Sequence, residues 1–143
     1  MKVRIKRIDK LLSLPEYKTA GAVAFDFASR VDMLIEPRSV AYIPLNIVLE
    51  PPEGHMVLLV ARSSLHKQGL MLANGVGIVD RDFSGNEDEY HAAVYNFTEE
   101  PVHISRGDRV AQGVFKSYEK AEWYEVDDLE NKSRGGFGTT GII

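Results

Sequence analysis

The chain of 143 residues has a hydrophobic fraction of 44%, which predicts one domain with a buried core. It contains no cysteine, which excludes disulfides, thiolate zinc sites and the zinc-dependent deaminases that carry a Cys-x-x-Cys signature. Its net charge of −4 argues against binding to nucleic-acid polymers, and no apolar run is long enough to cross a membrane, so we expect a cytoplasmic protein without polymer or membrane partners.

The first half of the chain predicts short strands separated by turns. Strands are expected at the alternating N-terminus around Val3 and Ile5 and over residues 22–29, 40–49 and 55–60, with a loop at 10–21 and a turn at 51–54. Asp26 interrupts the otherwise apolar segment A-V-A-F-D-F-A-S. A carboxylate in such a strand needs partners, so Asp26 either caps backbone amides or serves a ligand.

Residues 61–69 read A-R-S-S-L-H-K-Q-G and predict one short helix, capped by Ser63 or Ser64 and ended by Gly69. A helix N-terminus with hydroxyls and the guanidinium of Arg62 favours an oxyanion such as phosphate. The alternative is that Arg-Ser-Ser only starts a helix.

The segment N-G-V-G-I-V-D-R-D-F-S-G at residues 74–85 predicts a buried strand that enters a hairpin and ends in carboxylates. Strand alternation would place Asp80 and Asp82 on one side and Arg81 and Phe83 on the other, unless the chain already bends. Two carboxylates there suit a bound water, although both residues are also ordinary turn residues.

The second half predicts further strands and then a glycine-rich tail. Strands are expected over 90–97 and 109–115, the latter after a tight turn at 106–108, and residues 86–89 are expected to form a solvated acidic loop. The tail is too rich in glycine to order itself, so it is either disordered or an arm that orders over a ligand. Many short strands and little helix indicate an all-β sandwich or barrel.

Five of these segments resemble, in order, the signature motifs of the trimeric dUTPase (dUTP diphosphatase) family. Asp26 falls in the acidic place of the first motif, and Arg62-Ser63-Ser64-Leu65 follows the second, with Ala61 in place of proline. The third motif matches residues 77–85 with Phe83 in the tyrosine place, G-D-R-V-A-Q at 107–112 matches the fourth, and G-G-F-G-T-T-G at 135–141 matches the core of the fifth.

The resemblance implies a distorted jelly roll that assembles as a homotrimer, with sites built from three chains. We therefore expect a jelly-roll domain over residues 1–125 and an arm over residues 126–143 that closes over a neighbouring subunit's site. The implied reaction is Mg²⁺-assisted hydrolysis of dUTP to dUMP and pyrophosphate, which keeps uracil out of DNA.

The resemblance also implies roles for single residues. Asp80 would hold the water that attacks the α-phosphorus, and Asp26 would contact Mg²⁺ through water. Phe83 would lie under the deoxyribose, and Lys132 is an alternative to Arg134 at the γ-phosphate. The expected substrate-binding residues are Arg62, Ser63, Ser64, Asn74, Gly77, Val79, Phe83, Gln112, Arg134, Phe137, Gly138 and Thr139.

Two alternatives remain open. A dCTP deaminase would need a glutamate in the strand after the hairpin, whereas Glu87 and Glu89 fall in the preceding turn. A regulatory protein that binds dUTP, hydrolyses it weakly and contacts a partner through its trimer surface or its acidic loop would carry the same residues.

Overall fold

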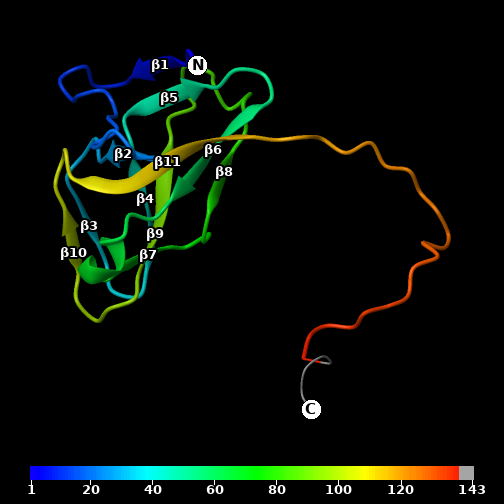
Figure 1. Ribbon diagram of the computed structural model, residues 1–143. Helices are drawn as coiled ribbons and strands as arrows, with labels where there is room; N and C mark the ends of the chain where they lie inside the picture. Colours follow the sequence, from blue (N-terminus) through cyan, green and yellow to red (C-terminus); the bar gives the residue numbers. More distant parts are fainter. Residues whose placement is uncertain (139–143) are drawn as a thin grey trace.

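The computed structural model describes residues 1–138 and is built almost entirely of β-strands (Figure 1). The strands are β1 (Arg4–Arg7), β2 (Phe25–Ala28), β3 (Met33–Ile35), β4 (Val40–Pro44), β5 (Ile47–Glu50), β6 (His55–Val60), β7 (Leu70–Leu72), β8 (Gly77–Val79), β9 (His91–Asn96), β10 (Val102–Ile104) and β11 (Arg109–Ser117). The helical content of this described part is one 3₁₀ turn, η1 (Leu65–Gln68). The all-β class expected from the sequence is confirmed.

All strand pairs are antiparallel, and most join segments that are distant in sequence. One sheet has the order β2-β11-β6-β8 and another the order β4-β9-β7, while β1 pairs with β5 and β3 with β10. Long connections between neighbouring antiparallel strands are typical of a jelly roll. Among residues 1–138, no helix has the length and apolarity that a membrane crossing takes.

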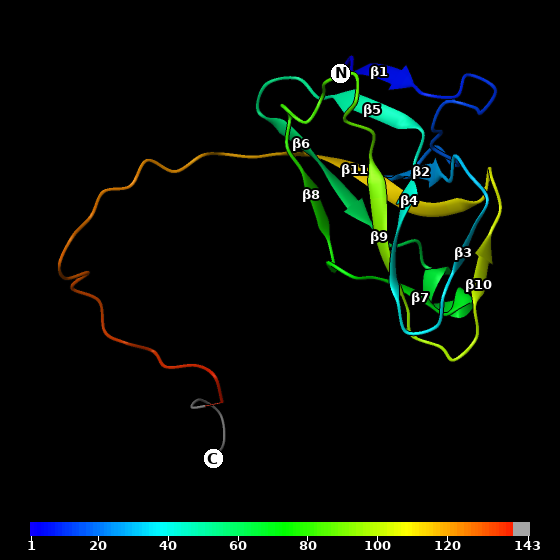
Figure 2. The same ribbon diagram turned by 180° about the vertical axis from the view of Figure 1, so that it is seen from behind.

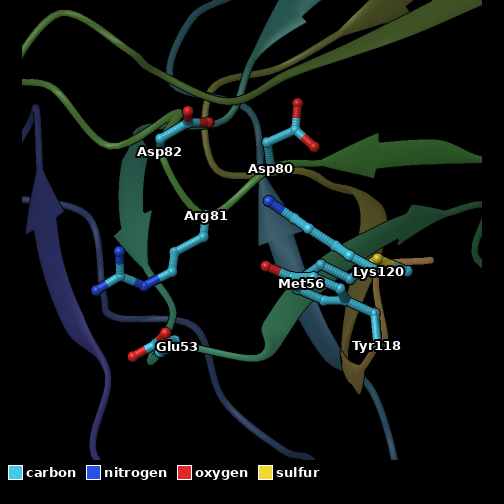
Figure 3. Close-up of a pocket in the computed structure, with 7 residues that line it drawn as sticks. All are labelled: Glu53, Met56, Asp80, Arg81, Asp82, Tyr118 and Lys120. Carbon is cyan, nitrogen blue, oxygen red and sulfur yellow. The ribbon is translucent and has the colours of Figure 1, made fainter. Parts of the chain in front are cut away.

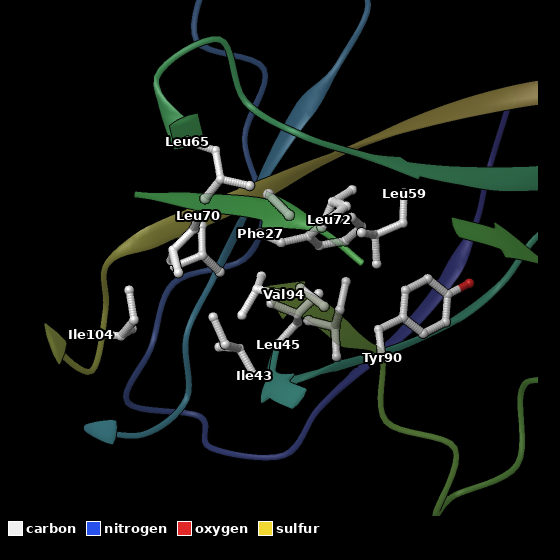
Figure 4. Close-up of a cluster of buried hydrophobic side chains, with 14 of the residues drawn as sticks. Phe27, Ile43, Leu45, Leu59, Leu65, Leu70, Leu72, Tyr90, Val94 and Ile104 are labelled. Carbon is white, nitrogen blue, oxygen red and sulfur yellow. The ribbon is translucent and has the colours of Figure 1, made fainter. Parts of the chain in front are cut away.

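The core lies between the sheets and gathers alternate side chains from their strands (Figure 4). On β2, Phe25 and Phe27 are buried, whereas Asp26 between them points to the other face. Gly113 on β11 faces these two rings, and a Cβ there would lie 2.7 Å from the nearest ring carbon of each. A glycine is therefore required at this position, because any side chain would displace the phenylalanine rings that anchor β2.

The expected strand over 40–49 is wrong, because this segment forms two strands. β4 pairs with β9 and β5 pairs with β1, so the chain leaves one sheet for another at Leu45 and Asn46. Asn46 takes a positive φ of 72° at this corner, a conformation that asparagine tolerates better than most residues. The expected strand over 22–29 is also shorter, since β2 covers only Phe25–Ala28.

The chain leaves the body after β11. From Tyr118 to Gly138 it forms no regular element and runs away from the sheets in both views (Figures 1 and 2). Trp123 and Tyr124 in this segment are almost fully exposed. This stretch contains all of the described part of the expected arm, residues 126–138.

Candidate functional site

Asp26 is the centre of a charged cluster on the sheet β2-β11-β6. Its Oδ1 accepts a hydrogen bond from Arg62 Nε at 3.1 Å, and its Oδ2 accepts one from Arg109 Nη1 at 3.2 Å. Its side chain is only 15% exposed. The partners of Asp26 are thus two guanidiniums, not the backbone amides considered from the sequence. One carboxylate between two cations leaves net positive charge, which favours a polyanionic ligand.

Strand register brings Gln112 into the same cluster. Gln112 lies opposite Asp26 on β2 and opposite Val60 on β6, and its Nε2 donates to the Ala61 carbonyl at 2.9 Å. Arg62 Nη1 donates to the Arg109 carbonyl at 3.1 Å. These bonds fix the start of the segment 61–64 against β11, so the expected phosphate-binding residues Arg62 and Gln112 do come together. Asp26 and Arg109 also line a cavity of about 220 Å³ beside the loop 12–18.

The expected helix after Arg62 forms only as a four-residue 3₁₀ turn. Gly69 ends it with a φ of 86°, as expected, but Ser64 at its N-cap makes no side-chain capping bond. Capping by a serine is therefore wrong. A turn this short has little dipole, so an anion here would be held by the guanidiniums and by the hydroxyls of Ser63 and Ser64.

The segment around β8 differs from the buried strand that the sequence predicts. Ile78 is 68% exposed and Val76 is 50% exposed, because β8 lies at the edge of its sheet in the described part of the chain, paired with β6. Gly77 packs against Leu59, whose Cβ would lie 3.0 Å from a Cβ at position 77. This contact gives Gly77 a structural reason in addition to the close ligand approach that the sequence suggested.

Asp80 lies where β8 ends and lines a cavity of about 560 Å³. The Phe83 amide donates to the Asp80 carbonyl at 3.2 Å, which makes residues 80–83 a turn. The chain thus already bends here, so strand alternation does not apply, and Asp80, Arg81 and Asp82 all line this cavity. Figure 3 shows Lys120 reaching across it toward Asp80.

Phe83 follows this turn, and its ring packs near the body. Its ring centroid lies 6.1 Å from that of Tyr90, with 36° between the ring planes. The side chain is still 42% exposed. Phe83 thus packs near Tyr90 and remains partly accessible to a ligand.

Within one chain, Asp80 does not lie beside the cluster of Asp26, Arg62 and Gln112. Val79 pairs with Val57, which places Asp80 opposite Met56 near the far end of β6. Arg62 is six residues farther along the chain than Met56, or about 20 Å along extended backbone. The chain therefore carries two separate groups of the expected site residues: the charged cluster, and the segment 74–83 with Asp80 and Phe83. The expected hairpin is wrong, because in residues 1–138 β8 pairs with β6 and not with its sequence neighbours β7 and β9.

Within residues 1–138, the expected arm residues lie away from both groups in this chain. Phe137 is fully exposed, and Arg134 Nε donates a local bond to the Gly135 carbonyl at 3.3 Å. Lys132 is exposed as well, and Gly138 has a φ of 82°. Thr139 lies outside the described residues.

Two charged residues have roles that the sequence reasoning missed. The resemblance implies that Asp108 and Arg109 chiefly hold their turn, yet Arg109 also pairs with Asp26 at 3.2 Å. Glu89 was assigned to a solvated loop, which is wrong: its side chain is 11% exposed and pairs with Arg30 at 2.7 Å. The two members of that pair are 59 positions apart, so no local pattern indicates it. Asp108 does hold its turn, since its Oδ2 accepts the Ser105 amide at 2.9 Å.

Among residues 1–138, no group of three His, Cys, Asp or Glu side chains is arranged to hold a metal ion. Mg²⁺ commonly keeps several waters and binds through one or two carboxylates and the substrate's phosphates. Asp26, a partly buried carboxylate beside the cations of the cluster, fits such a contact through water.

Comparisons with known proteins agree on one family. The family model described as dUTPase matches residues 11–141. A deoxyuridine 5'-triphosphate nucleotidohydrolase of Desulfitobacterium hafniense is 40% identical over 99% of this chain and 96% of its own length. The crystal structure of dUTPase from Streptococcus mutans superposes with a TM-score of 0.76 at 28% identity, covering 83% of this chain and 98% of that one. A mutant dUTPase from phage phi11 of Staphylococcus aureus, whose structure concerns the coordination of a structural Mg(II) ion, has a TM-score of 0.81 at 18% identity, covering 92% of this chain and all of that one.

Proposed function

We infer the function from one premise, which is that this chain belongs to the dUTPase family. The protein is a dUTP diphosphatase, an enzyme of nucleotide metabolism that hydrolyses dUTP. The observation that carries this conclusion is the match over nearly the whole chain to named dUTP nucleotidohydrolases. The charged cluster around Asp26 supports it, because Arg62, Arg109 and Gln112 suit a triphosphate.

We propose further that the active site is assembled from a homotrimer. Asp80 lies opposite Met56, and about 20 Å of extended backbone separates Met56 from Arg62. This separation supports a site that takes the charged cluster from one protomer and the segment 74–83 from another. An exposed apolar face offers a surface for assembly, since Val40 and Met71 flank Tyr95 across the sheet β4-β9-β7 and both are half exposed. The arm over residues 126–143 would then come from a third protomer.

The proposed catalytic group is Asp80. An aspartate is ionised at pH 7, and here it would orient a water and accept its proton as that water attacks the α-phosphorus, giving dUMP and pyrophosphate. Such proton transfer contributes typically ~10²–10⁴-fold. The remaining acceleration would come from charge stabilisation and positioning by Arg62, Ser64 and Gln112.

Magnesium is the proposed cofactor, bound to the triphosphate and contacted by Asp26 through water. When bound, it would supply additional neutralisation of phosphate charge. The two guanidiniums on Asp26 keep this carboxylate in one orientation, which is what a contact through ordered water needs.

Selectivity for the nucleoside is proposed to reside in the segment 74–83. Backbone groups of Gly77 and Val79 with the side chain of Asn74 would read the uracil edge, and β8 has the free strand edge that such pairing uses. Phe83, which remains partly accessible, would lie under the deoxyribose. In the arm, Phe137 would stack on the base, while Arg134 or Lys132, Gly138 and Thr139 would meet the phosphates.

Product analysis tests the function directly. Purified protein is incubated with Mg²⁺ and dUTP, dCTP, dTTP or UTP, and pyrophosphate and ammonia are followed separately. We expect pyrophosphate from dUTP alone. Ammonia from dCTP would support the deaminase alternative, although β9 contains no glutamate. Tight binding of dUTP with little pyrophosphate would support the regulatory alternative.

A further inference from the structure

The loop that carries Asp80 and Phe83 returns to the sheet through Glu89, whose carboxylate is held from two directions. Arg30 donates to it through Nε at 2.7 Å and Nη2 at 3.0 Å, and the backbone amide of Asn46 donates at 2.9 Å. The hydrogen bonding of Arg30 to the Glu89 carboxylate raises the pKa of Arg30. A bidentate pair with a third donor on a nearly buried carboxylate tolerates little displacement, so Glu89 fixes this end of the loop.

Glu89 is followed directly by Tyr90, on which Phe83 rests. The Tyr90 amide donates to the Ile47 carbonyl at 2.9 Å, and the Tyr90 carbonyl accepts the Leu45 amide at 2.8 Å. The Tyr90 ring is fully buried at the edge of the core (Figure 4), 6.0 Å from the Phe27 ring and 6.1 Å from the Phe83 ring. The Tyr90 hydroxyl has no hydrogen-bond partner in the described part of the chain. Tyr90 therefore holds Phe83 through ring packing and not through a hydrogen bond.

The rest of the loop is closed mainly by short-range bonds. The Phe83 amide donates to the Asp80 carbonyl within the first turn. The Gly85 amide donates to Asp88 Oδ2 at 2.8 Å within the next turn. Within residues 1–138, the further bond to this loop from outside it is the exposed one from Lys6 Nζ to the Asn86 carbonyl at 3.1 Å. The position of the Phe83 ring over the body therefore depends on the anchored end at Glu89.

We propose that Glu89, held by Arg30, is a positioning residue for the Phe83 ring. By fixing how far this ring lies from the body of the protein, Glu89 determines how strongly the site rejects the 2′-hydroxyl of ribonucleotides. The inference rests on the proposed place of Phe83 under the deoxyribose. Phe83 has no hydroxyl with which to anchor itself, and an apolar surface rejects an added hydroxyl by only ~10²-fold. Discrimination of this kind is steric, so it is sensitive to a small displacement of the ring.

The test compares kcat/KM for dUTP and UTP in the full-length protein with Glu89→Gln. This variant keeps the length of the side chain but places an amide against the donors of Arg30 and Asn46. We expect the dUTP-to-UTP ratio of kcat/KM to fall by about tenfold, part of the ~10² that an apolar contact supplies, mainly through a lower KM for UTP. The matched control is Glu99→Gln, which breaks the exposed pair of Glu99 with Arg38 and should leave the ratio unchanged.

Two further variants separate positioning from a general loss of structure. Arg30→Lys keeps the positive charge but not the bidentate geometry, so it should lower the ratio less than Glu89→Gln; it also carries the test if Glu89→Gln does not fold. In a Phe83→Leu background, Glu89→Gln should change the ratio no further, because the proposed route to the substrate is already removed.

An equal loss of activity on both nucleotides, or an additive effect in the Phe83→Leu background, would overturn the inference. Unchanged discrimination in a folded Glu89→Gln protein would overturn it as well and leave the proposed function intact. A wild-type protein without dUTP hydrolysis would overturn the proposed function, and this inference with it.

Discussion

Asp26 and Arg62 form a hydrogen-bonded ion pair at 3.1 Å between a carboxylate of β2 and a guanidinium that follows β6. The second guanidinium on Asp26, from Arg109, makes the pair part of a cluster with excess positive charge. Arg62 thus uses Nε for Asp26 and Nη1 for the Arg109 carbonyl, and the planar fork holds one orientation toward a phosphate.

Arg62→Lys should therefore impair the enzyme although it keeps the charge. A lysine cannot make both hydrogen bonds from one plane, and a hydrogen bond to a charged group contributes roughly 1.5–3 kcal/mol, so kcat/KM for dUTP should fall by about 10- to 100-fold. Steady-state pyrophosphate release measures this. Arg38→Lys, in the exposed pair with Glu99, is the control, and an equal loss in both variants would contradict a specific role of Arg62.

Asp80→Asn should keep nucleotide binding and lose turnover. The amide retains the size of the side chain but no longer accepts a proton from water, so kcat should fall by ~10²–10⁴-fold, while the Kd of a non-hydrolysable dUTP analogue changes little. Calorimetric titration and single-turnover kinetics measure the two quantities. Retained turnover would remove Asp80 from the mechanism.

Motifs in the sequence identified Asp26 and Arg62 separately, but the ion pair between them follows from the strand order β2-β11-β6. That order results from pairing between segments that are distant in sequence. Local periodicity carries no information about which distant segments pair. The same limit explains Glu89, whose partner Arg30 lies in another connection. Glu89 follows Asn86, Glu87 and Asp88, and from composition alone such a run is solvated.

Strands were predicted well where they are long and alternate, as for β6 and β11. β3, β7 and β10 have three residues each, too few to show a period of two. The apolar residues of β8 predicted burial, yet Ile78 is exposed because its strand lies at a sheet edge. Hydrophobicity predicts that a side chain is buried, but it does not show whether the surface that buries it belongs to the same chain.

The pH dependence of thermal stability should reveal how much Asp9 stabilises the folded protein. A hydrogen bond from Arg106, followed by one from the Leu11 amide, lowers the pKa of Asp9 from its ordinary value of 3.8. Because the folded-state pKa is depressed, this stabilisation is present above pH 3.8 and is lost as the pH falls through the lower folded-state value.

Thermal unfolding of wild type and Asp9→Asn between pH 6 and pH 2.5, about the range over which such a carboxylate titrates, measures this contribution. The difference in Tm should be constant at the upper end and narrow at the lower end. Asp127→Asn, on the exposed segment after β11, is the control. A difference that persists unchanged at the lowest pH would show that the charge of Asp9 is not responsible.

If each site takes Asp80 from one protomer and Arg62 from another, two inactive variants should regain activity when they assemble into the same complex. Asp80→Asn and Arg62→Ala are co-expressed with different tags, and complexes that carry both tags are purified. In a cyclic trimer with two copies of one variant and one of the other, one site in three takes Arg62 and Asp80 from protomers that retain them. We therefore expect about one third of wild-type turnover from the mixed complexes and almost none from either variant alone. Mixed trimers confirmed by mass that remain inactive would mean that Asp80 and Arg62 act within one chain, despite the separation of about 20 Å of extended backbone between Arg62 and Met56, which lies opposite Asp80.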